Sequence, residues 1–187
     1  PPLTVLKRPS HFVAETAGGC RNFPSWRTND QFLLRLSKPA RVSVVMMRED
    51  LETRNSSKPL LGKKSKAKAA MKKPRSRDNF LIGFVVSRTR SAYADRRVLE
   101  IAQEDEMDKT SYSAAFEVGR EFVSDEDAAT RLGPESTYAP NDFVIVPSTY
   151  EPGKTGSYEL AVYTDDADAT LTLLPVASWQ RQHARGE

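Results

Sequence analysis

The sequence has a single cysteine, Cys20, and only two histidines, His11 and His183. One cysteine excludes an intramolecular disulfide, so nothing in the sequence indicates an oxidising compartment. We therefore predict a cytoplasmic location, with peripheral attachment to membranes as a second option. A closed zinc site usually takes four Cys or His ligands, so these three residues, far apart in the sequence, also argue against zinc.

Long apolar runs are absent as well. No stretch reaches the roughly 18 to 20 apolar residues that a membrane-spanning helix needs, and the first residues lack the apolar centre of a signal peptide. The chain begins with Pro1 and not with methionine. We therefore expect a fragment of a longer polypeptide, whose other parts could hold an activity.

Acidic residues are missing between Lys58 and Arg77. Eight positive charges lie within residues 63–77: Lys63, Lys64, Lys66, Lys68, Lys72, Lys73, Arg75 and Arg77. The net formal charge is +3, so the rest of the chain carries 3 − 8 = −5. The sequence thus predicts a mildly acidic body with a basic loop over residues 58–79, which is flexible because it has no apolar face to bury.

Helix signals are confined to residues 124–131, where Ser124 and the acids after it suit one or two turns. The other signals are short β-prone runs with Pro and Gly turns between them. They cover residues 31–36, 41–47, 80–86, 97–101, 142–148, 157–163 and 170–174. Many short strands with few helices predict an all-β antiparallel sandwich or barrel.

Two details of these runs can be compared with a structure. The runs 31–36 and 41–47 are joined by a turn that contains Pro39, and we predict that they form a hairpin. In the run 157–163, Tyr158, Leu160 and Val162 share one face, as in a half-buried strand. The run 142–148 is apolar on both faces, as in a more central strand.

Two sequence blocks carry a resemblance to a known family. Residues 16–23, followed by Trp26, Asn29, Gln31 and Phe32, resemble the segment that opens the β-sandwich domain III of calpains. Asp30 stands where that family has proline. Residues 142–154 are similar to the family's strand and turn that end in Glu-Pro.

The resemblance implies a jelly-roll-like sandwich of about eight strands over residues 12–175, with the basic loop as an insertion. Residues 1–11 would then be an N-terminal edge or linker, and residues 176–187 a tail or linker. The Cys, His and Asn triad of calpains lies upstream of the matching region. We therefore predict no catalytic residue in this chain, and a packing role for Cys20 in preference to a nucleophile paired with His11.

The acidic loop that resides early in calpain domain III corresponds here to residues 37–40, which are short and basic. The resemblance therefore does not predict for this chain the regulatory switch that the acidic loop provides in calpains. Among the remaining acids, Asp165, Asp166 and Asp168 are the best calcium candidates, because they lie between two expected strands at a sandwich end. The competing interpretation is a solvated surface.

The eight cations of the basic loop predict binding to an anionic partner, either phospholipid or an acidic protein. A solvated insertion is the alternative, and nucleic acid is disfavoured because the loop lacks aromatic residues. By resemblance, the chain is a regulatory module of a calpain-like cysteine endopeptidase, without catalysis of its own and with no required cofactor. Its partners would be the protease core or other domains of the parent protein. The rival hypothesis is a sandwich adaptor without any protease.

Overall fold

A computed structural model describes residues 2–48, 80–90, 106–115, 117–124 and 138–174. Nine strands and one short helix lie in these ranges. They are β1 (Thr4–Phe12), the 3-10 helix η1 (Pro24–Thr28), β2 (Phe32–Arg35), β3 (Arg41–Arg48), β4 (Ile82–Arg90), β5 (Glu106–Lys109), β6 (Glu117–Val123), β7 (Tyr138–Thr149), β8 (Gly156–Thr164) and β9 (Thr170–Leu173).

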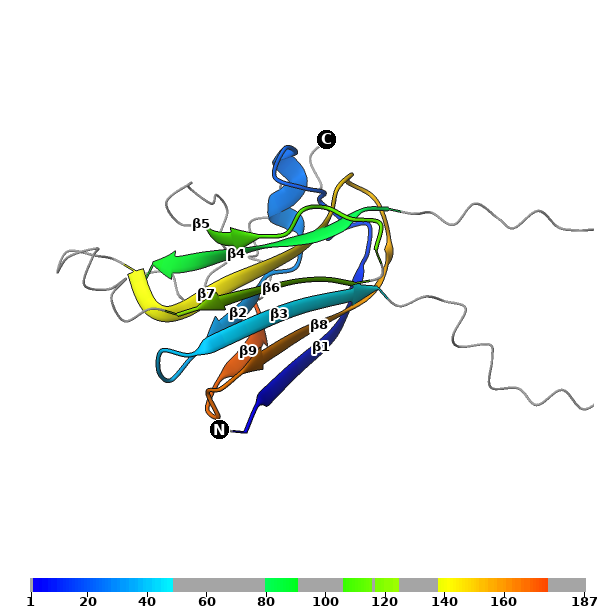
Figure 1. The fold of residues 1–187 in the computed structure, drawn as a ribbon. Helices are drawn as coiled ribbons and strands as arrows, with labels where there is room; N and C mark the ends of the chain where they lie inside the picture. The colour runs from blue at the N-terminus through cyan, green and yellow to red at the C-terminus, as the bar shows by residue number, and fades with distance from the viewer. Residues whose placement is uncertain (1, 49–79, 91–105, 116, 125–137, 175–187) are drawn as a thin grey trace, which may run out of the picture.

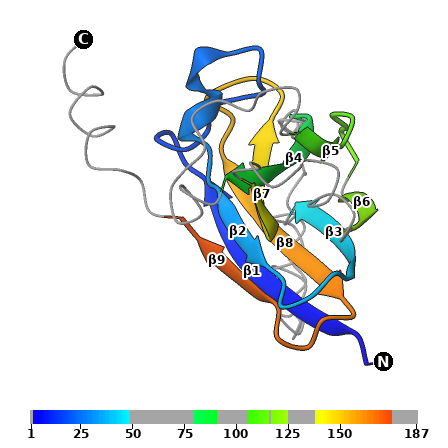
Figure 2. The same cartoon turned by 90° about the vertical axis from the view of Figure 1, so that its left-hand side faces the viewer.

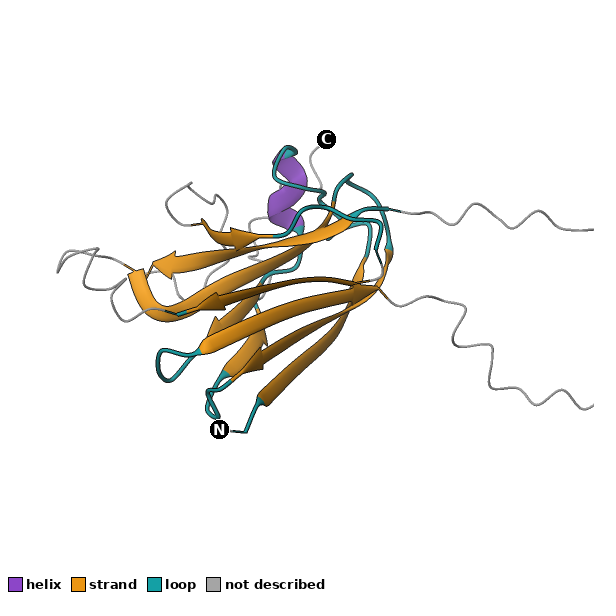
Figure 3. Ribbon diagram, viewed as in Figure 1, coloured by secondary structure: helices purple, strands orange, loops and turns teal. Residues whose placement is uncertain are grey.

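The strands form two antiparallel sheets packed face to face (Figure 1, Figure 3). The four-stranded sheet has the order β1-β8-β3-β6, and the five-stranded sheet has the order β5-β4-β7-β2-β9. Without β9, these two orders are those of an eight-stranded jelly roll, and β9 adds one strand beside β2. The predicted antiparallel sandwich is confirmed.

The first residues are part of this sandwich. β1 is an edge strand that pairs with β8 along its whole length, from Thr4 opposite Thr164 to Phe12 opposite Gly156. The sequence predicts an edge or linker over residues 1–11, and the structure places residues 4–11 in an edge strand. Residues 4–11 therefore belong to the four-stranded sheet as its edge.

The predicted hairpin between residues 31–36 and 41–47 is wrong. β2 pairs with β7 and β9, whereas β3 pairs with β6 and β8, so residues 36–40 cross from one sheet to the other. The crossing places Leu34 of β2 and Val42 of β3 in the same core from opposite sides. Alternating apolar residues are expected both in a hairpin within one sheet and in a connection that crosses between sheets, so the alternation could not distinguish the two.

The core lies between the sheets and contains side chains from both. Tyr158, Leu160 and Val162 of β8 are all fully buried there, which confirms the predicted face of that strand. Phe12 stacks on Tyr158 with ring centroids 4.4 Å apart. Each such aromatic side chain buries a large apolar area, so these rings contribute much of the stability of the sandwich.

A second apolar cluster covers the outer face of the five-stranded sheet. It consists of Trp26, Leu33, Val85, Val144, Val146 and Leu174. Since Phe143 and Ile145 face the inner core, β7 is buried on both faces and lies in the middle of its sheet. The central position predicted for residues 142–148 is confirmed.

Arginine side chains close both open sides of the sandwich. Arg8 of β1 donates from Nε and Nη2 to the carbonyl oxygen of Leu171 on β9, at 3.1 and 2.7 Å. Arg120 of β6 donates from Nε to the carbonyl oxygen of Lys109 on β5, at 3.0 Å. Each bond joins the edges of opposite sheets and occupies a carbonyl that would otherwise be open to another strand.

Candidate functional sites at the two ends of the sandwich

The connections between strands gather at two ends. The segment that contains η1 lies at one end, and the N-terminus lies at the other (Figure 1, Figure 2). We call the first the junction end, made by residues 13–31 and 150–155. We call the second the acidic end, made by residues 36–40 and 165–169.

The two blocks that resemble calpains meet at the junction end. The backbone N–H of Cys20 donates to the carbonyl oxygen of Tyr150 at 3.2 Å, and that of Gly153 donates to the carbonyl oxygen of Ala17 at 2.7 Å. Segments far apart in the sequence thus form one hydrogen-bonded unit. The sequence shows both blocks but does not show that they are in contact.

Asn29 organises the junction from the inside. Its side chain is fully buried, accepts at Oδ1 from the N–H of Gly18 at 2.9 Å and donates from Nδ2 to the carbonyl oxygen of Gly19 at 2.8 Å. Ser25 Oγ donates to the carbonyl oxygen of Gly18 at 2.7 Å. Because buried backbone groups need partners, Asn29 stabilises a turn that would otherwise be costly to bury.

A side chain does not fit at either glycine of this turn: at Gly18 a neighbouring backbone atom is too close, and at Gly19 the backbone conformation is also unfavourable. A Cβ on Gly18 would lie 2.0 Å from the carbonyl oxygen of Ser25. Gly19 has φ +77°, and a Cβ there would lie 2.8 Å from the backbone nitrogen of Pro152. The left-handed conformation of Gly19 is unfavourable for residues with a side chain.

Cys20 is buried in this junction, with 4% of its surface exposed. His11 lies on β1, where its Nδ1 is 2.8 Å from the hydroxyl of Ser157, its cross-strand neighbour. The thiol therefore packs inside a hydrogen-bonded turn, while the imidazole has a separate partner at the surface. This geometry supports the packing role of Cys20.

Asp30, which departs from the family pattern, has a defined role that the sequence did not reveal. Its Oδ2 accepts hydrogen bonds from Ser10 Oγ at 2.8 Å and from the buried hydroxyl of Tyr158 at 3.2 Å. Burial raises the pKa of Tyr158, and the negative charge of Asp30 raises it further. Asp30 thus joins β1 and β8 to the start of β2, a role that proline could not perform.

Tyr112 is a second residue that the sequence did not single out. Its hydroxyl is 2.6 Å from Ser148 Oγ, and its ring meets Tyr150 edge to face with centroids 5.5 Å apart. Burial raises the pKa of Tyr112 to about 12. The hydroxyl therefore stays protonated and packs as a neutral group beside the junction.

The three aspartates predicted to bind calcium lie on one connection at the acidic end but face different partners. Asp166 is fully buried, and its carboxylate accepts from the N–H of Ser37 at 2.6 Å, from Ser37 Oγ at 2.7 Å and from the N–H of Asp168 at 3.1 Å. Asp165 accepts from the N–H of Arg41 at 2.9 Å, and Asp168 is exposed.

Burial would raise the pKa of Asp166. The hydrogen bonds from the hydroxyl and N–H of Ser37 and from the N–H groups of Asp168 and Lys38 outweigh it, so this pKa is lowered. In the part of the chain that the structure describes, no group of three or more His, Cys, Asp or Glu side chains is arranged to hold a metal ion. Asp166 and Asp165 stabilise the neighbouring connection at residues 36–40, and calcium at this end stays a prediction.

The eight cations of the basic loop lie outside the described residues, as do the tail at 176–187, the strand run 97–101 and the helix signal after Ser124.

The residues on either side of the segment 49–79 are described. Arg48 donates from Nη1 to the carbonyl oxygen of Phe80 at 3.1 Å and from Nη2 to that of Ala114 at 2.9 Å. Its guanidinium carbon lies 5.6 Å from the centroid of the Phe80 ring. Arg48 therefore holds together the two places where residues 49–79 join the sandwich.

The fold and the junction define a jelly-roll β-sandwich module. A family model described as calpain large subunit, domain III, matches residues 10–163. The chain therefore belongs to the calpain domain III family, as the two sequence blocks predict.

Individual relatives include two kinds of protein. A protein named Serine/threonine-protein kinase 4 homolog B from Dictyostelium discoideum is 23% identical over 92% of this chain and 12% of its own length. The calpain-1 catalytic subunits of Homo sapiens and Rattus norvegicus are 25% and 27% identical over 84% of this chain and 20% of theirs. The chain thus spans a fifth or less of the length of these relatives.

A chain of the solved Israeli acute paralysis virus particle covers 93% of this chain at 7% identity, with a TM-score of 0.33 that is too low to bear on the fold. Among the described residues, no helix is long and apolar enough to cross a bilayer.

Proposed function

We propose that this chain is a non-catalytic regulatory module of a calpain-like cysteine endopeptidase, coupling the protease core to calcium, phospholipid or other domains of the parent protein. The observation that carries the proposal is the match of residues 10–163 to the third domain of the calpain large subunit. The burial of Cys20 in the junction supports it, because a buried thiol cannot reach a peptide bond of a substrate.

The second candidate is an adaptor in a protein without a protease. The relative named as a kinase favours this candidate, since its match covers 92% of this chain, against 84% for the calpains. Similar modules occur in a relative named as a kinase and in relatives named as calpain catalytic subunits, so the module itself does not determine which reaction the parent protein catalyses. Under either candidate, the chain would bind and position other parts of its protein.

The partner outside the parent protein would be an anionic phospholipid surface, reached from the cytoplasm through the basic loop. Without the eight cations of residues 63–77 the chain carries −5, so the loop can approach an anionic surface while the body stays away from it. Arg48 and Phe80 hold the base of this loop at the junction end. Clustered Lys and Arg contribute about 1 kcal/mol each at such a surface.

Vesicle co-sedimentation tests this role. We expect the chain to bind vesicles that contain phosphatidylserine and to bind neutral phosphatidylcholine vesicles weakly. Changing Lys63, Lys64, Lys66, Lys68, Lys72 and Lys73 to serine should weaken binding more than roughly tenfold, since six charges of about 1 kcal/mol each are removed. Added salt should weaken the binding of the wild type, because exposed charges are screened over about 8 Å.

The matched control changes the same six lysines to arginine, which keeps the charge and should keep the binding. Calcium is added in a parallel series, with Asp165 and Asp168 changed to asparagine in one variant. Equal binding by the wild type and the serine variant would remove the loop from the mechanism. If neither protein binds the vesicles, contacts within the parent protein would remain as the function.

A further inference from the structure

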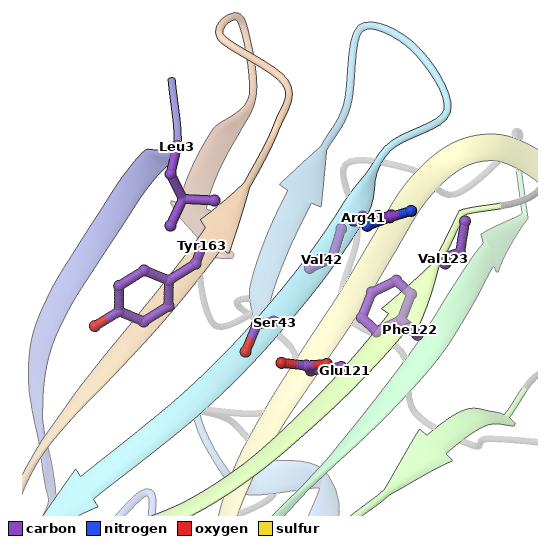
Figure 4. A pocket seen from close by; sticks show the side chains of 8 residues that line it. All are labelled: Leu3, Arg41, Val42, Ser43, Glu121, Phe122, Val123 and Tyr163. Carbon is purple, nitrogen blue, oxygen red and sulfur yellow. The ribbon is translucent and has the colours of Figure 1, made fainter. Parts of the chain in front are cut away.

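A hollow of about 760 Å³ lies on the outer face of the four-stranded sheet, near the acidic end (Figure 4). It is lined by Leu3, Arg41, Val42, Ser43, Glu121, Phe122, Val123 and Tyr163. The strand register explains its shape. Ser43 of β3 lies between Tyr163 of β8 and Glu121 of β6, so a small side chain separates two larger ones.

The same face carries exposed apolar side chains. Leu3, Val5 and Val123 are 62%, 45% and 61% exposed, and they account for three of the six large apolar residues that are most exposed in the described part of the chain. Val5 lies opposite Tyr163, and Val123 lies opposite Arg41. An apolar surface gathered around a hollow is typical of a protein interaction site.

Two opposite charges flank the hollow. Arg41 and Glu121 are diagonal neighbours on adjacent strands, and such neighbours lie roughly 7–8 Å apart. Within the part of the chain that the structure describes, neither side chain has a hydrogen bond or an ion pair, since only the backbone N–H of Arg41 is used, by Asp165. A positive and a negative group therefore lie near each other at this surface, without partners among the described residues.

The geometry points to a second copy of this chain as the occupant of this face. A two-fold axis that runs parallel to this face, at right angles to the Arg41–Glu121 diagonal and above its middle, would place Arg41 of each copy against Glu121 of the other. Both ion pairs form with charges that this one sequence supplies. Ser43 and Val123 flank that diagonal, so each would lie near the axis and face its own counterpart in the other copy.

The alternatives fit this face less well. A small molecule would stay largely exposed, because Leu3 and Val123 at the rim are themselves more than half exposed, whereas typical ligand sites enclose most of their ligand. An unrelated peptide would have to bring both charges in the right spacing. The pairing of two copies does not depend on the proposed regulatory role.

Sedimentation velocity of the 187-residue chain from micromolar to millimolar concentration tests the pairing. We expect a monomer that becomes a dimer as concentration rises, and less dimer in high salt. R41E and E121R should each weaken the dimer about tenfold or more, because each creates like-charge contacts at two symmetry-related places. The double variant with both changes should restore it, since the opposite charges face each other again.

The matched control is E117R, which makes the same charge change on the same strand and face, away from the hollow. It should leave the dimer unchanged, and thermal unfolding should show that every variant is folded. A chain that stays monomeric at millimolar concentration would overturn the inference. A dimer that both single variants and the double variant weaken alike would also overturn it, because the ion pairs would then not face each other.

Discussion

Replacing Gly18 with alanine is expected to lower the free energy of unfolding by about 3 kcal/mol, the upper end of the usual cost of overpacking. The added methyl group would lie 2.0 Å from the carbonyl oxygen of Ser25 and 2.7 Å from Thr28 Oγ1. Relief requires a shift of the backbone that Asn29 holds on both sides. Chemical denaturation of the wild type and the variant measures the difference.

The matched control is alanine at Gly153, in the other half of the junction. Gly153 has φ +75°, but a Cβ there meets no atom within 4 Å. Only the conformational cost remains, which is about 1 to 2 kcal/mol for a left-handed residue. Equal losses at the two positions would show that backbone conformation, and not the close contact at Gly18, dominates the junction.

Replacing Asp166 with alanine is expected to lower the free energy of unfolding by about 2 to 3 kcal/mol at neutral pH. The change leaves the partly buried N–H groups of Ser37 and Asp168 and the hydroxyl of Ser37 without their acceptor, and an unpaired polar group costs up to roughly 1–3 kcal/mol when it is buried. Asp168 provides the control, because its carboxylate lies on the same connection but is exposed. Alanine at Asp168 should change the stability little.

The contribution of Asp166 should also depend on pH. Its pKa is lower in the folded chain than in the unfolded chain, where it lies near 3.9. The unfolded state therefore binds the proton first, so stability is lost as the pH falls from the unfolded pKa through the folded one. The gap between the wild type and D166N should be constant above about pH 5 and should narrow below about pH 4. A gap that widens towards acid would contradict the assignment.

The sandwich could be predicted because its strands are short and alternate, and because two blocks of sequence resemble a known family. The face of β8 followed from the spacing of Tyr158, Leu160 and Val162, which are all buried. The partners of β2 and β3 did not follow, because strand pairing depends on contacts across the chain. Pro39 marks a turn, but a turn can lead to the adjacent strand or to the opposite sheet.

The candidate sites were less predictable, since they depend on contacts between distant segments. The contact of Asn29 with the two glycines is local, but the bond between Cys20 and Tyr150 joins the two ends of the family pattern. The acids at 165–168 look alike in the sequence. Only the fold shows that Asp166 is buried against Ser37 while Asp168 is exposed.

The most direct test of the central claim is a casein digestion assay on the 187-residue chain, with calcium and a reducing agent present. A non-catalytic module whose only cysteine is buried in the junction should release no peptides above the blank, and C20A should behave as the wild type does. Cleavage by the wild type that C20A abolishes would contradict the account, because it would make Cys20 a nucleophile and this chain an enzyme.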